Sequence, residues 1–173
     1  MVTLLDACPE ATEDLRKNRL GFDLGYNYRM IIVSACLAGL NTRYDGGNQA
    51  DERVIALLKA GIAIPVCPEQ LGGLPTPRPK VEIQDGDGHD VLSGNAVVLA
   101  EDGTDLTEQF IKGASEVLKL AMTMNVREAI LKDGSPSCGV NHIKRKGEET
   151  VGMGVLAALF SLNGLKVRSN DSL

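Results

Sequence analysis

Three of the four cysteines in this 173-residue chain stand among residue types that usually surround a site rather than a core. Cys36 precedes a glycine-rich loop, Cys67 begins a Cys-Pro-Glu triplet, and Cys138 lies in the run Ser-Pro-Ser-Cys-Gly. Such polar, turn-forming neighbours differ from the apolar elements that normally hold an inert thiol. None of the cysteines forms a Cys-x-x-Cys pair, so the usual zinc-finger and thioredoxin spacings are absent.

Each of these cysteines comes at or just after the end of a predicted strand. The apolar runs 30–35, 62–66 and 126–132 predict strands, the first of them buried on both faces. Cys36 and Cys67 are separated by about one strand–helix–strand unit of roughly 30 residues. Because loops at the carboxyl edge of a parallel sheet form its ligand crevice, we expect the three thiols to meet in one pocket. For any single cysteine, a simple packing role is an open alternative.

Three thiolates gathered in one pocket could hold a metal centre. Iron–sulfur clusters usually take four cysteine ligands, so a four-iron cluster on three cysteines keeps one iron open to a soft donor such as sulfur. A zinc site of the Cys₃His type is the alternative, with His142 as the nearest histidine after Cys138. Cys8 could complete a four-thiolate site, although it belongs to a dissimilar N-terminal segment.

Four further polar residues near the cysteines are candidates for catalysis: Asp45, Glu69, Ser135 and Ser137. Either carboxylate could act as a general base toward water, and either serine could donate a hydrogen bond to a substrate or to a cluster sulfide. Simpler roles in shaping turns and capping amides are open for all four. Arg43 and Arg78 could bind an anionic or carbonyl group.

The alternation of strand and helix patterns predicts an α/β fold with a mostly parallel sheet, helices on both faces and a small β-hairpin. Helical patterns cover 51–60, 106–125 and 155–162, a last strand covers 165–168, and the hairpin pairs 81–83 with 96–99 around the turn-rich segment 85–90. Pro65 cannot donate to a ladder, which indicates the end of a strand or an edge.

Short signals mark the ends of the predicted helices. Asp51 is the expected N-cap of the first helix and Gly61 its C-cap. Asp105 with Glu108 resembles a capping box at the start of the long helix.

The composition indicates one domain over residues 30–173, with residues 1–29 as an N-terminal extension that need not belong to the core. Apolar residues make up 43% of the chain, enough for one hydrophobic core. Charges interrupt every apolar stretch before Met30, which argues against a signal peptide, and no run is long enough to span a membrane. The expected location is therefore the cytoplasm.

Five motifs, in order, resemble a bacterial family long described as a domain of unknown function, whose characterised members are 2-thiouracil desulfurases. They are residues 34–39 (SACLAG), 43–47 (RYDGG), 66–69 (VCPE), 72–79 (GGLPTPRP) and 135–139 (SPSCG). The resemblance covers Met30 to about Ser169. One departure is Ala38, which stands where a second leucine is common.

The resemblance implies a Rossmann-like fold and a [4Fe-4S] cluster held by Cys36, Cys67 and Cys138. It implies that the open iron captures the sulfur of a thiolated pyrimidine and that water replaces this sulfur at carbon. The products are then uracil and sulfide, without net redox change. A carboxylate and a serine are expected to assist, and the resemblance does not decide among the four candidates named above.

The sequence thus predicts a cluster-dependent, non-redox desulfurase that acts on a small thiolated pyrimidine. The alternative is a non-catalytic protein that binds metal or sulfide through the same three cysteines. A tRNA partner, with residues 144–146 as a phosphate contact, is less favoured because the net charge of the chain is −5.

Overall fold

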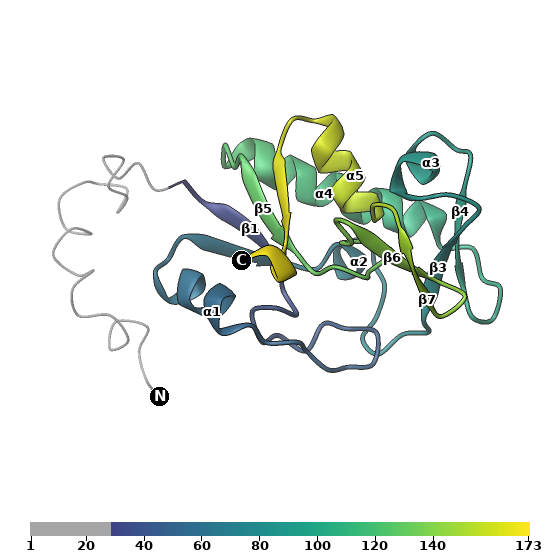
Figure 1. The fold of residues 1–173 in the computed structure, drawn as a ribbon, viewed down its shortest axis with the longest axis horizontal. Coiled ribbons are helices and arrows are strands. Elements are labelled where there is room, and N and C mark those ends of the chain that lie inside the picture. The colour runs from purple at the N-terminus through teal and green to yellow at the C-terminus, as the bar shows by residue number, and fades with distance from the viewer. Residues whose placement is uncertain (1–28) are drawn as a thin grey trace, which may run out of the picture.

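The computed structural model describes residues 29–173, so the N-terminal extension and Cys8 lie outside the described residues. Four parallel strands form the central sheet in the order β2 (Ala63–Val66), β1 (Ile31–Ser34), β5 (Glu128–Leu131) and β8 (Lys166–Ser169). Figure 1 shows these strands at the centre of the molecule. The four strands predicted for this sheet are therefore confirmed, and β2, which contains Pro65, lies at an edge as expected.

Helices cover both faces of the sheet because adjacent residues of a strand point to opposite faces. Val33 of β1 packs with Val54 of α1 (Glu52–Lys59) on one face. Ile32 joins the larger core, which includes α4 (Thr107–Thr123) and α5 (Val155–Leu162). Figure 1 shows α1 on one side of the sheet and the other two helices across it. The predicted Rossmann-like α/β fold is confirmed.

Two antiparallel hairpins lie together at one end of the molecule (Figure 1). The first pairs β3 (Val81–Gln84) with β4 (Val97–Ala100), as predicted. The second pairs β6 (His142–Arg145) with β7 (Glu148–Val151) and was not predicted. Its residues are mostly charged and exposed, so it has no apolar alternation from which a strand could be inferred.

Three short helices also went unpredicted: α2 (Pro68–Leu71), α3 (Gly88–Leu92) and the 3₁₀ turn η4 (Asn170–Ser172). Each is shorter than two helical turns, too short for a helical period to show. The segment 85–90, expected to be a turn, contains the start of α3, which begins with a capping box between Asp87 and Asp90.

The predicted helix ends are partly confirmed. The Asp51 side chain accepts a hydrogen bond from the Arg53 amide at the start of α1, as an N-cap should. Ala60 is the C-cap of this helix, and Gly61 follows it with a φ of +69°. The capping box predicted for α4 is wrong, because Leu106 is the N-cap and has no side-chain cap.

No helix in residues 29–173 is long and apolar enough to cross a membrane.

Helices α2 and α4 meet backbone to backbone behind the segment that follows Cys67. A methyl group on Gly113 of α4 would collide with the carbonyl oxygen of Pro68, and one on Gly72 with that of Gln109. Glycine therefore lets the long helix approach the start of α2, next to a candidate metal ligand.

Replacing Gly113 with alanine should lower the free energy of unfolding by about 1–3 kcal/mol, because the added methyl group has no space. At a solvent-exposed position inside a helix, the same change would raise the free energy of unfolding by up to about 1 kcal/mol. Chemical denaturation measures the difference, with Lys112→Ala on the exposed side of the same helix as the control. A Gly113→Ala protein as stable as the wild type would contradict the close contact.

Candidate functional site

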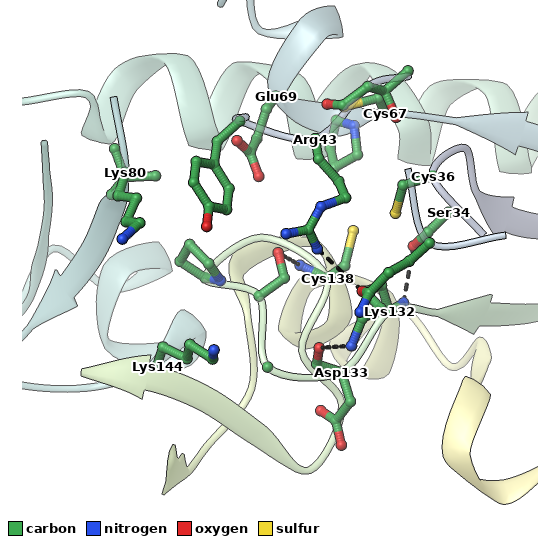
Figure 2. Close-up of a pocket in the computed structure, with 18 of the residues that line it drawn as sticks. Ser34, Cys36, Arg43, Cys67, Glu69, Lys80, Lys132, Asp133, Cys138 and Lys144 are labelled. Carbon is green, nitrogen blue, oxygen red and sulfur yellow. Dashed lines mark hydrogen bonds between the residues drawn. The ribbon is translucent and has the colours of Figure 1, made fainter. Parts of the chain in front are cut away.

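Cys36, Cys67 and Cys138 line one cavity of about 620 Å³ at the carboxyl edge of the sheet. In Figure 2 the side chains of Cys36 and Cys138 point toward one another, and Cys67 lies farther from them in the same cavity. The structure thus brings together three thiols that are far apart in the sequence. No disulfide joins them.

Local hydrogen bonds hold each cysteine in its loop. The carbonyl of Cys36 accepts the amides of Gly39 and Gln49, which fixes the turn after β1. Cys67 is the N-cap residue of α2, and its sulfur lies 3.8 Å from the carbonyl oxygen of Thr42. The amide of Cys138 donates to a serine hydroxyl within its own loop.

Burial dominates the protonation of the three thiols. It raises the pKa of Cys36, and the neighbouring Cys67 adds to this effect, while Arg43 and Lys132 oppose it. Burial likewise raises the pKa of Cys67, and that of Cys138 well above the ordinary value. The thiols are therefore protonated at neutral pH unless a metal cation replaces their protons.

Glu69 lines the same cavity as part of a buried ion pair. Arg78 Nε donates to Glu69 Oε2 at 2.6 Å, and only 4% of the arginine side chain and 12% of the glutamate side chain are exposed. Burial raises the pKa of Glu69, and Arg78 partly offsets this shift. The other oxygen, Oε1, accepts no hydrogen bond from residues 29–173, so it is free for a water in the cavity.

The remaining donors of Arg78 are used within the protein. They contact the carbonyls of Thr42 and Pro75 and the hydroxyl of Thr76 at 3.0–3.2 Å. Arg78 therefore holds neighbouring segments of the protein together, and it is not free to bind an anion as the sequence suggested.

Asp45 lies outside the cavity lining, with 44% of its side chain exposed. Its two oxygens accept from Arg43 at 3.0 and 3.2 Å, and one of them also accepts the amide of Gly47. The hydrogen bond from Arg43 and that from the Gly47 amide lower its pKa. This carboxylate therefore shapes its turn and fixes Arg43, which does line the cavity.

The two candidate serines differ in position. Ser135 lines the cavity, and its hydroxyl oxygen accepts the amides of Ser137 and Cys138, both at 3.2 Å. Its own proton remains available to a partner in the cavity. Ser137 is 2% exposed and does not line the cavity.

His142 does not line the cavity, so the structure does not bring it to the cysteines. Its Nδ1 lies 3.5 Å from a carboxylate oxygen of Asp133. As the side chains stand in residues 29–173, no group of three or more histidine, cysteine, aspartate or glutamate residues could hold a metal ion.

A model of the 2-thiouracil desulfurase family matches residues 31–172. The chain belongs to the 2-thiouracil desulfurase family. A Bacillus subtilis (strain 168) protein described as uncharacterized protein YbbK is 42% identical over 147 residues, which cover 83% of this chain and 97% of that protein. A solved structure of a [4Fe-4S]-dependent thiouracil desulfidase, TudS (DUF523Vcz), is 40% identical with a TM-score of 0.74. The match covers 84% of this chain and 93% of that one.

Membership in the 2-thiouracil desulfurase family confirms the resemblance that the five motifs predicted, and the prediction of a desulfurase-like enzyme with it. The match to TudS also confirms the predicted fold and supports an iron–sulfur cluster as the cofactor. The individual roles of the candidate residues stay predictions.

Several cavity residues of this family member were not singled out as site residues by the sequence. They are Tyr44, Lys80, Lys132 and Asp133, while Lys144, considered only as a phosphate contact, lines the cavity as well. Lys132 and Asp133 directly follow β5, so the rule that located the cysteines at strand ends could have found them. Lys80 and Lys144 reach the cavity from the two hairpins, and no local sequence pattern predicts how these hairpins dock.

Asp133 organises the loop that carries Cys138. Its Oδ1 accepts the amides of Val140, Asn141 and His142 at 2.8–3.1 Å. Burial opposes its ionisation, but these amides outweigh burial and lower the pKa of Asp133 to about 2. The carboxylate therefore stays ionised at neutral pH and fixes the loop.

Asp133→Asn should lower the free energy of unfolding at pH 7 by about 2 kcal/mol, because the amides lose a charged acceptor. A lowered pKa stabilises the fold above the unfolded value near 4, and this stabilisation is lost as the pH falls through about 2. The gap between wild type and variant should therefore shrink over this range. Denaturation from pH 7 to pH 2 measures it, with the exposed Asp85→Asn as control. A gap independent of pH would contradict the assignment.

Proposed function

We propose that this chain is a cluster-dependent desulfurase that converts a thiolated pyrimidine, such as 2-thiouracil, into its oxo form and sulfide. The observation that carries the proposal is that three thiols and one buried carboxylate open onto the same cavity of a 2-thiouracil desulfurase family member. The relative described as a [4Fe-4S]-dependent thiouracil desulfidase supports the same reaction.

The donor set suits a [4Fe-4S] cluster held by Cys36, Cys67 and Cys138. Thiolates are the usual ligands of such clusters, which spread their ligands over several irons. A tetrahedral zinc ion, with Zn–S bonds of about 2.3 Å, would need its sulfurs within about 4 Å of one another. Within residues 29–173 the cavity offers three thiols and no histidine, which fits a cluster held by cysteines better than a zinc site of the Cys₃His type.

When bound, the cluster would supply an iron atom without a protein ligand, which can act as a Lewis acid toward sulfur. The chain's own contribution is to place a base, a hydrogen-bond donor and a closed wall around the substrate. Overall, the carbon–sulfur double bond is replaced by a carbon–oxygen double bond at the expense of one water, and hydrogen sulfide leaves. No electron is gained or lost.

Glu69 is the proposed general base. Its free Oε1 can take a proton from a water in the cavity, while Arg78 holds the other oxygen at 2.6 Å. Burial moves its pKa upward from the ordinary value, toward the range in which a base works best at neutral pH. Asp45 is the weaker candidate, because Arg43 occupies its oxygens and lowers its pKa.

Ser135 is the proposed hydrogen-bond donor. Two backbone amides fix the position of its oxygen at the cavity wall, so the hydroxyl can donate its proton from a defined position. Ser137 acts through the backbone of this loop instead, because its amide is one of the two donors. A tRNA partner and a cytoplasmic location stay predictions.

Protein purified without oxygen should contain about four irons and four sulfides per chain and should release sulfide from 2-thiouracil. Cys36→Ala, Cys67→Ala and Cys138→Ala should each lose iron and activity. The cavity contains three cysteines in the described residues, so no other thiol there can replace a missing ligand. Cys8→Ala is the matched control and should keep both. One zinc per chain with no sulfide release would instead support the non-catalytic metal-binding alternative.

Glu69→Gln should lower kcat for 2-thiouracil at least about 100-fold, because the amide cannot accept the proton of water. Iron content is measured in every sample, because the amide oxygen can still accept from Arg78 but the buried guanidinium loses its charged partner. Asp45→Asn should lower kcat far less. Steady-state kinetics on iron-matched samples measure both, and an equal or larger loss for Asp45→Asn would exclude Glu69 as the base.

A further inference from the structure

Tyr44 is the aromatic side chain that faces the cavity in the part of the chain described by the structure. Phe110 and Phe160 are 1% and 0% exposed and belong to the core. Tyr44 is half-buried, belongs to neither hydrophobic cluster, and lines the same cavity as the cysteines. Tyr44 is therefore not a residue of the hydrophobic core.

Two cations hold the ring of Tyr44. The guanidinium carbon of Arg43 lies 5.3 Å from the ring centroid, and the ammonium of Lys80 lies 5.8 Å from it. Figure 2 shows that the two cations approach from different parts of the cavity wall. Cation–π contacts of this kind help to fix the ring.

Hydrogen bonds within the protein also fix Arg43 and the backbone of Tyr44. Asp45 binds two nitrogens of Arg43, and Gln49 accepts from the third at 3.1 Å. The carbonyl of Tyr44 accepts the amide of Arg78 at 2.8 Å. Backbone and ring are therefore both held before any ligand enters.

The phenol hydroxyl remains free. It makes no hydrogen bond within residues 29–173, and it is not among the fully buried polar atoms that lack a partner. A hydroxyl on a fixed ring at a cavity wall can donate to a ligand at little entropic cost. The hydroxyl is therefore the group through which Tyr44 can recognise a polar ligand.

We propose that Tyr44 is the residue that recognises the pyrimidine ring, by donating a hydrogen bond from its hydroxyl to a ring carbonyl oxygen. This inference rests on the proposed function and names a binding group within it. Recognition of the carbonyl is independent of the sulfur, so the oxo product should be bound through the same contact. Asp45 is then a positioning residue, which acts on Tyr44 through Arg43.

The test uses full-length protein purified without oxygen, in the variants Tyr44→Phe and Tyr44→Leu. Equilibrium dialysis with uracil gives a dissociation constant that does not depend on turnover, and kinetics with 2-thiouracil give KM and kcat. Tyr44→Phe should weaken uracil binding and raise KM by about three- to tenfold, the range of one neutral hydrogen bond, with kcat nearly unchanged. Tyr44→Leu should weaken binding further.

Iron and sulfide per chain should be the same in all variants. Ser161→Ala, which removes an exposed hydroxyl far from the cavity lining, is the matched control. Unchanged uracil binding in Tyr44→Phe, no uracil binding by the wild type, or a loss of iron parallel to the loss of affinity would each overturn the proposal. Failure of the proposed function appears differently, as a wild type that binds uracil but releases no sulfide.

Coupling between Asp45 and Tyr44 tests the positioning role. Asp45→Asn should weaken uracil binding two- to threefold, and the double variant Asp45→Asn/Tyr44→Phe should bind no more weakly than Tyr44→Phe alone. If Asp45 acted on the loop independently of Tyr44, the fold-changes in the uracil dissociation constant of the two single variants would multiply in the double variant. That result would overturn the role of Asp45.

Discussion

The ion pair between Arg78 and Glu69 is the interaction on which the geometry of the cavity depends. Both charges are almost out of contact with water, where a carboxylate or guanidinium without its partner costs about 3–5 kcal/mol. The same guanidinium also holds the carbonyl of Thr42 in the loop after β1 and that of Pro75 in the proline-rich segment. One side chain thus links the loop after β1, the start of α2 and the proline-rich segment.

Burial strengthens the attraction within this ion pair but disfavours the charged, thiolate form of the three cysteines. An isolated thiolate is unfavourable in the same surroundings, and the burial of Cys138 is the most complete of the three. Arg43 and Lys132 stabilise a thiolate at Cys36 only in part. A metal centre held by these cysteines, as proposed, would supply the missing positive charge at each sulfur, and its binding would release protons from the thiols. Arg43 and Lys132 would then offset part of the negative charge on the ligands.

Much of the fold could be predicted because its central elements have clear patterns. The apolar helix 155–162 has the predicted bounds, and the strands that precede Cys36 and Cys67 lie where expected. The convergence of the cysteines followed from the parallel sheet alone, since strand ends share an edge whatever the details of the loops.

The parts that could not be predicted depend on contacts between distant segments. No hydrophobic periodicity in the sequence reports these contacts. Examples are the ion pair of Glu69 with Arg78, the hydrogen bonds between Asp45 and Arg43, and the docking of the β6–β7 hairpin. The capping box expected at Asp105 failed because Leu106 became the helix cap, a difference of one residue that propensity cannot resolve. Sequence reasoning therefore predicted that the three cysteines share one cavity but could not choose between the two carboxylates.

The loop between β5 and β6, which carries Cys138, is shaped by its own hydrogen bonds. Asp133 accepts two backbone amides from this loop and that of His142 at the start of β6, and Ser135 accepts two from the loop. Zinc fingers, by contrast, fold only when the metal binds. The polypeptide alone supplies the hydrogen bonds of this loop, so we expect the backbone around Cys138 to keep its shape whether or not a metal centre is bound.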